Sequence, residues 1–141
     1  MSMTLMAIVG LSCNLETSDL NKALDTLDLP LSITHTADLR EHTGFLPAEI
    51  SGQEAGVETY FETSRDLIDR LPPHEALDNR EVGVVLFSIG SRASEIASAL
   101  YIASALVSRC QALVFDAESG RYMSNADALK YAEFVLKTED G

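Results

Sequence analysis

The sequence contains no tryptophan and few other aromatic residues, with four tyrosines and five phenylalanines among 141 residues. The core is therefore expected to consist of leucine, isoleucine, valine and alanine. No stretch approaches the roughly 20 consecutive apolar residues that a membrane-spanning helix requires, so no transmembrane helix is expected. Hydrophobic residues make up 46% of the chain and charged residues 23%, as in ordinary globular proteins. We expect a single domain with one core over residues 1–141.

Basic residues are also scarce. Lysine and arginine total 10 against 22 aspartate and glutamate residues, which gives a formal net charge of -12. Nucleic acids and anionic membranes are held by lysine and arginine, so neither is expected as a partner. A basic protein would instead be drawn toward such a field and would associate faster at low salt. A surplus of carboxylates that serves only solubility is the alternative interpretation, and the sequence leaves it open.

Only two cysteines are present, Cys13 and Cys110, and neither belongs to a CxxC or Cys/His metal-binding spacing. We therefore expect buried free thiols in the reducing cytoplasm. The apolar stretch that precedes Cys13 lacks the positively charged start of an export signal, so we interpret it as a first strand. The sequence does not indicate an oligomeric state.

Apolar periodicity and turn residues predict an alternation of strands and helices. The expected fold is α/β (α+β): a single mixed β-sheet of about five strands with helices packed on it. Residues 38–56 are the least regular stretch and are predicted to be a long loop, anchored on the core by Phe45, Leu46 and Ile50. The expected strands cover residues 3–12, 31–36, 57–61, 82–89 and 112–115, and the expected helices begin near residues 17, 64, 93 and 124.

No complete catalytic motif is present: the sequence has no GxxxxGK, GxGxxG, GxSxG or HExxH. The turn after Gly90 does lead from a strand into a helix N-terminus, where Ser91, Arg92 and Ser94 could hold an anion. Capping of the helix by Ser91 with a local Arg92 is the simpler interpretation.

A second polar cluster extends from His35 to His42 and contains two imidazoles and two carboxylates. These groups suit a transition metal chemically, but their spacing matches no metal motif and no second cluster completes a site. A polar loop is the favoured interpretation, with no metal and no cofactor. Together with the Gly90 turn, this loop supports an alternative function, a small-molecule-binding domain or an enzyme.

A strand over residues 57–61 would place Glu58, Tyr60 and Glu62 on one face. Residues four apart on a strand lie about 13 Å from each other, too far for a glycosidase carboxylate pair. No catalytic residue is therefore predicted, and we interpret these side chains as part of a contact face. The candidate partner-binding residues are Glu41, Glu49, Glu54, Glu58, Tyr60 and Glu62.

Three segments carry a resemblance to a loose set of uncharacterised bacterial proteins. They are Gly44-Phe-Leu-Pro47, Gly56-Val-Glu-Thr-Tyr-Phe-Glu62 and Val114-Phe-Asp-Ala-Glu-Ser-Gly120. Some such proteins resemble immunity proteins, which neutralise secreted bacterial toxins. The resemblance implies a non-catalytic protein that binds a basic partner, a toxin domain being one example. It assigns no role to any particular residue.

Overall fold

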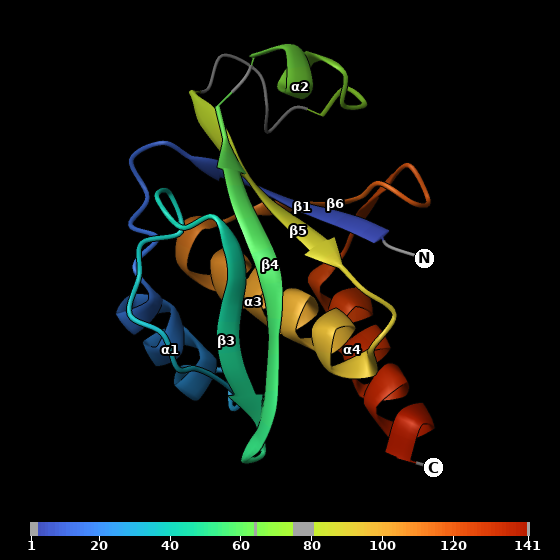
Figure 1. The fold of residues 1–141 in the computed structure, drawn as a ribbon. Coiled ribbons are helices and arrows are strands. Elements are labelled where there is room, and N and C mark those ends of the chain that lie inside the picture. The colour runs from blue at the N-terminus through green and yellow to red at the C-terminus, as the bar shows by residue number, and fades with distance from the viewer. Residues whose placement is uncertain (1–2, 64, 75–80, 141) are drawn as a thin grey trace.

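The computed structural model describes residues 3–63, 65–74 and 81–140, which form one sheet with helices on both of its faces (Figure 1). The strands are β1 (Met3–Gly10), β2 (Leu31–Ile33), β3 (Gly44–Ile50), β4 (Gln53–Glu62), β5 (Val82–Ile89), β6 (Leu113–Asp116) and β7 (Arg121–Met123). The helices are α1 (Thr17–Thr26), α2 (Arg65–Asp69), α3 (Ala93–Cys110) and α4 (Asn125–Asp140).

The sheet has seven strands in the order β2-β3-β4-β5-β1-β6-β7. The predicted combination of strands and helices in one sheet is confirmed. Two details of the prediction are wrong. The sheet has seven strands rather than about five. It is antiparallel rather than mixed, because every neighbouring pair of strands is antiparallel. Strand β1 lies between β5 and β6 and runs antiparallel to both, so the helical connections do not join parallel neighbours.

Strand β3 lies inside the stretch that the sequence predicts to be a long loop. Ser51 and Gly52 both have positive φ, at 51° and 83°, which is the backbone of a tight two-residue hairpin turn. The turn joins β3 to β4, so the glycines that suggest a loop belong to a hairpin. Strand β7 was also missed; it has three residues and follows the turn at Gly120, where φ is 71° as a glycine turn requires.

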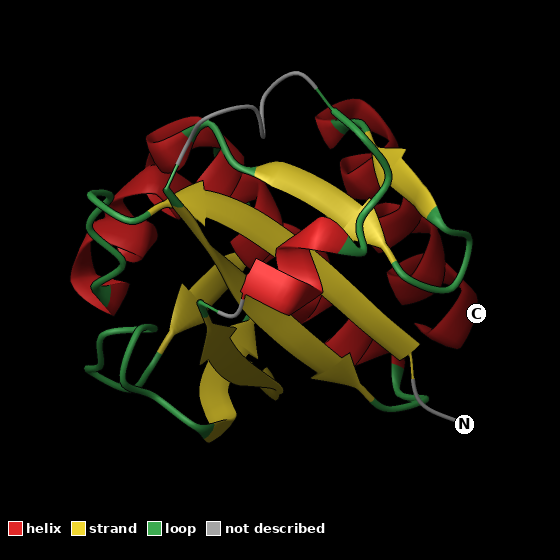
Figure 2. Ribbon diagram, turned by 90° about the horizontal axis from the view of Figure 1, so that it is seen from above, coloured by secondary structure: helices red, strands yellow, loops and turns green. Residues whose placement is uncertain are grey.

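Three helices cover one face of the sheet and the short helix α2 lies on the other (Figure 2). Helices α1, α3 and α4 enclose the main core, which includes Leu20, Phe87, Leu106 and Ala132. On the opposite face Ile68 and its neighbours on α2 cover β1, β5 and β6. Among the described residues, no helix covers the outer surface of β3 and β4.

Small side chains allow α3 to pack close to the sheet. Ala97, Ala103 and Ala105 are fully buried. Ser98 lies among them, and its Oγ accepts a hydrogen bond from the Gly56 N–H at 3.0 Å while donating to the Ser94 carbonyl at 2.7 Å. One buried hydroxyl thus joins the helix to β4. Within the described residues, no helix has both the length and the apolar character needed to cross a membrane.

The two cysteines form a disulfide, which corrects the prediction of free thiols. Cys13 follows β1, Cys110 ends α3, and their Cα atoms lie 5.8 Å apart although 97 positions separate them in the sequence. The segment after β1 is also held by Arg40, whose guanidinium donates to the carbonyls of Leu11 and Cys13. Because α3 packs against β1, the two distant ends meet.

Candidate functional site

Four of the predicted partner-binding residues lie on the uncovered surface of β3 and β4. Along these strands the alternate residues, such as Leu46 and Val57, are fully buried beneath the helices. The residues between them point the other way, toward solvent. We call this surface the acidic face; it consists of Phe45, Glu49, Glu54, Glu58 and Tyr60.

The strand register places two carboxylates directly opposite each other. Glu49 pairs with Glu54 across the β3–β4 hairpin, and Phe45 pairs with Glu58. Like charges in opposite positions of an antiparallel pair destabilise the sheet, by roughly 0.2–1 kcal/mol. Neither Glu49 nor Glu54 forms an ion pair with a residue in the described part of the chain. The fold thus tolerates a repulsion that it does not relieve.

A large aromatic ring lies exposed beside these carboxylates. Phe45 is 50% exposed, which corrects the expectation that it anchors a loop on the core. Its ring packs over Gly56, where φ is 126° and where a Cβ would lie 2.7 Å from the ring and collide with the Leu46 carbonyl. Only glycine fits this position, and its lack of a side chain allows the ring to lie against the strand.

Tyr60 and Glu58 are joined on the acidic face. The Tyr60 hydroxyl donates to Glu58 Oε1 at 2.7 Å. This hydrogen bond raises the pKa of Tyr60, and desolvation and the charge of Glu58 raise it further. The carboxylate of Glu58 is held in one orientation by a ring that stays protonated at neutral pH.

The other two predicted contact residues lie away from the centre of the acidic face. Glu62 is the last residue of β4 and is exposed. Glu41 lies in the turn before β3, where its N–H donates to the Asp38 carbonyl at 2.9 Å. That turn packs against the start of α1, since the Leu39 N–H donates to the Leu15 carbonyl. By the alternation along β4, Glu62 lies on the same side as Glu58 and Tyr60, as the sequence predicts, whereas Glu41 lies outside the two strands.

The Gly90 turn differs from the predicted capping arrangement. Arg92, rather than Ser91, is the N-cap residue of α3, and its side chain makes no capping hydrogen bond. The carboxylate of Glu95 in the first helical turn lies so close to Gly90 that a Cβ there would collide with it. This carboxylate already places negative charge at the positive end of the helix. An anion at this turn would therefore meet a carboxylate as well as the positive end of the helix.

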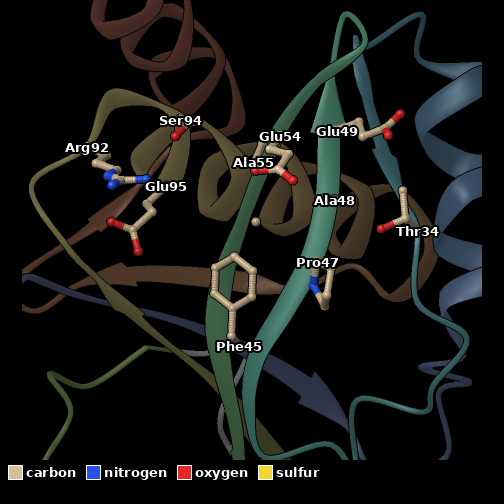
Figure 3. Close-up of a pocket in the computed structure, with 11 residues that line it drawn as sticks. Thr34, Phe45, Pro47, Ala48, Glu49, Glu54, Ala55, Arg92, Ser94 and Glu95 are labelled. Atoms are coloured by element: carbon tan, nitrogen blue, oxygen red, sulfur yellow. The ribbon is translucent and has the colours of Figure 1, made fainter.

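A pocket of about 370 Å³ joins this turn to the acidic face (Figure 3). Phe45 lies at its centre, Arg92, Ser94 and Glu95 form one side, and Glu49 and Glu54 lie toward the other. Three carboxylates and one guanidinium thus line the pocket. The lining residues are Thr34, Phe45, Pro47, Ala48, Glu49, Glu54, Ala55, Gly56, Arg92, Ser94 and Glu95.

The cluster from His35 to His42 is an ordered loop. The two imidazole rings lie 5.5 Å apart, and His42 Nε2 lies 3.0 Å from the Phe45 carbonyl oxygen. The Asp38 carboxylate accepts from the Arg40 N–H at 2.9 Å. Of residues 3–63, 65–74 and 81–140, no three histidine, cysteine, aspartate or glutamate side chains are grouped to hold a metal ion. No residue from His35 to His42 lines the pocket; Thr34, the residue before this loop, does.

Sequence reasoning missed Phe45 and Glu95 as site residues. Both depend on tertiary structure: Phe45 becomes exposed because β3 is a strand, and Glu95 approaches β3 because α3 packs on β4. No protein-family model matches the chain, and neither a curated protein nor a solved structure is significantly similar to it. The functional argument therefore depends on the geometry of the site.

Proposed function

We propose that this chain is a non-catalytic domain that binds a basic protein through the acidic face. The observation that supports this most directly is the pairing of Glu49 with Glu54 across the hairpin, beside an exposed aromatic ring. A lysine or arginine side chain from a partner would neutralise the repulsion. The ring of Phe45 would at the same time receive the aliphatic stem or the cation itself.

The finer proposal is that the basic partner is a bacterial toxin domain and that this chain is its immunity protein. Two observations support it: the net charge of -12, and the sequence resemblance carried by the segments around Gly44, Gly56 and Gly120. An inhibitor of an enzyme with a phosphate-binding site needs a surface of opposite charge to cover that site. The carboxylates of the acidic face have this character.

The alternative, a small-molecule site built from the Gly90 turn and the His35 to His42 loop, has weaker support. Arg92 and Ser94 do line the pocket, but the two histidines do not. The same pocket is also open to the acidic face, which suits a side chain of a bound protein.

Cytoplasmic location remains a prediction, and the disulfide between Cys13 and Cys110 gives it a test. A reducing cytoplasm keeps such pairs as thiols, whereas an oxidising compartment preserves the disulfide. Acid quenching of fresh cells followed by alkylation would show which state the protein has in its host. Alkylated thiols would agree with the cytoplasm, and protected cysteines would place the chain in an oxidising compartment.

The partner proposal can be tested by affinity capture from the source organism with three versions of the protein. The wild type is compared with Glu49→Gln/Glu54→Gln and with the control Asp25→Asn/Glu118→Gln. Each double variant removes two exposed carboxylates, but only the first changes the acidic face. We expect the wild type and the control to retain the same basic protein and the first variant to lose it.

The captured partner is then purified and its association rate is measured at 50 and 500 mM salt. We expect the rate to fall by about tenfold or more, because steering by opposite charges is screened. An association rate that does not change with salt would contradict the proposal. Equal loss of binding in both double variants would show that net charge, and not the acidic face, is responsible.

A further inference from the structure

A second pocket, of about 390 Å³, lies on the helical side of the sheet. It shares no lining residue with the pocket beside Phe45. The turn between α1 and β2 forms one wall, α4 forms another, and α3 contributes a single residue. The lining residues are Asp28, Leu29, Pro30, Tyr101, Leu129, Glu133, Leu136 and Lys137.

Tyr101 is the buried polar group of this pocket. The residue is only 3% exposed, yet its hydroxyl forms no hydrogen bond with any residue that the structure describes. The hydroxyl oxygen is also not among the unpartnered atoms sealed inside the protein, so it keeps access to the pocket that Tyr101 lines. A buried tyrosine hydroxyl ordinarily has a partner. A hydroxyl with this access can bond a water molecule or a polar group of a ligand in the pocket.

The charges around the pocket select among possible ligands. Tyr101 and Glu133 line the same pocket. Burial raises the pKa of Tyr101, and the negative charge of Glu133 raises it further. Asp28 adds a second exposed carboxylate, and Lys137 is the single cation among the lining residues. A cationic head group would find two carboxylates and a tyrosine oxygen that can accept hydrogen bonds. An anionic head group would be repelled by both carboxylates.

Below these charges the pocket is apolar. Leu29, Leu129 and Leu136 are partly buried and pack against the main core. Pockets of 300–1,000 Å³ with apolar walls and a few polar groups are typical of small-molecule sites.

We propose that this pocket binds a small organic ammonium ion, with its hydrocarbon part against the leucines and its N–H groups donating to Tyr101 and Glu133. The pocket shares no residue with the acidic face. The result of the ligand-binding experiment therefore does not test the proposed protein partner.

The test uses hexylamine as the probe, with hexanol, hexanoate and methylamine as matched compounds. Binding is followed by NMR of the leucine methyl groups, which also locates the site. We expect hexylamine to shift the methyl signals of Leu29, Leu129 and Leu136 and to bind at least about fivefold more tightly than hexanol. Hexanoate and methylamine should leave these signals unchanged at the same concentrations.

Variants then identify the groups that hold the ammonium. Tyr101→Phe keeps the ring and removes the hydroxyl, and Glu133→Gln keeps the shape and removes the charge. Each should weaken hexylamine binding by about tenfold, the usual effect of losing a hydrogen bond to a charged group. The control Asp127→Asn makes the same charge change as Glu133→Gln on the exposed surface of α4, outside the pocket, and should leave binding unchanged.

Three results would overturn the proposal. Equal binding of hexanoate and hexylamine would show that the pocket does not select a cation. Binding of methylamine as tight as that of hexylamine would show that the leucines do not contribute to binding. Equal weakening by Asp127→Asn and Glu133→Gln would mean that the amine responds only to the overall charge of the protein.

Discussion

The disulfide between Cys13 and Cys110 allows a quantitative prediction of stability. It joins positions separated by 97 residues. In the chain-entropy description, closing a loop of about 100 residues stabilises the folded state by about 4.7 kcal/mol at 25 °C, because the unfolded chain loses conformational freedom. A domain of this size is typically stable by only about 5–15 kcal/mol. The crosslink therefore supplies a large fraction of the total.

We expect Cys13→Ala/Cys110→Ala to lose about 4–5 kcal/mol in the free energy of unfolding. At roughly 3–4 °C per kcal/mol, its midpoint of thermal unfolding should fall by about 15 °C. The measurements are urea denaturation followed by circular dichroism and thermal denaturation, each with and without a phosphine reductant. Reduction should lower the stability of the wild type to that of the variant and leave the variant unchanged.

An unchanged midpoint on reduction of the wild type would refute this reasoning. That result would mean either that the cysteines are not crosslinked or that the crosslink does not restrict the unfolded chain. Counting thiols in the denatured protein distinguishes the two cases.

Three further predictions concern the acidic face. Glu54→Gln should raise the free energy of unfolding by roughly 0.2–1 kcal/mol in urea denaturation, because it removes the repulsion with its cross-strand neighbour; a decrease would contradict the inferred repulsion. Gly56→Ala should lower it by about 1–3 kcal/mol, since φ is 126° there and the added Cβ meets a carbonyl and an aromatic ring. Gly10→Ala, where nothing lies within 4 Å of the added atom, is its control and should have a much smaller effect. Finally, Glu58→Gln should lower the pKa of Tyr60 toward its ordinary value in an ultraviolet titration, because the carboxylate favours the protonated phenol. In the wild type, the contribution of Tyr60 to stability is fully present below the ordinary pKa of tyrosine. It is lost as the pH rises through the raised pKa of the folded state.

Elements with one strong local signal could be predicted from the sequence. The apolar run Val82–Ile89 is β5 with the predicted ends, and the periodic apolar residues from Ala93 onward form α3. The helix predicted to begin near residue 124 is α4, and Ser124 caps it, with its Oγ accepting from the Asp127 N–H at 3.1 Å. In each case, neighbouring residues in the chain contain the information.

Features that depend on distant residues could not be predicted. The same spacing of glycine and proline fits a loop and a hairpin. Only the backbone conformation at Ser51 and Gly52 distinguishes the two and shows that β3 is a strand. The disulfide depends on α3 ending beside the segment that follows β1, and no local pattern encodes this proximity. The antiparallel sheet order has the same origin, because it depends on which strands pair.

The candidate site also combines features that the sequence predicts with features that only the fold defines. Glu49 and Glu54 were selected from the sequence for their charge alone, as part of an expected loop. Their direct opposition follows from the register of the hairpin, and Phe45 becomes part of the site only because alternate residues of β3 face solvent. Sequence composition thus predicted the sign of the charge, and the fold defined where it is concentrated.

The register also explains why the residue types at these two positions are informative. A shift of the hairpin by one residue would turn Leu46 and Val57 toward solvent, and both are now fully buried. The fold therefore requires the register, but it requires nothing of the exposed side chains at Glu49 and Glu54, where any polar residue would suffice. Two carboxylates in these positions are expected to reduce stability. A positively charged group from the partner that we propose would give them a physical role.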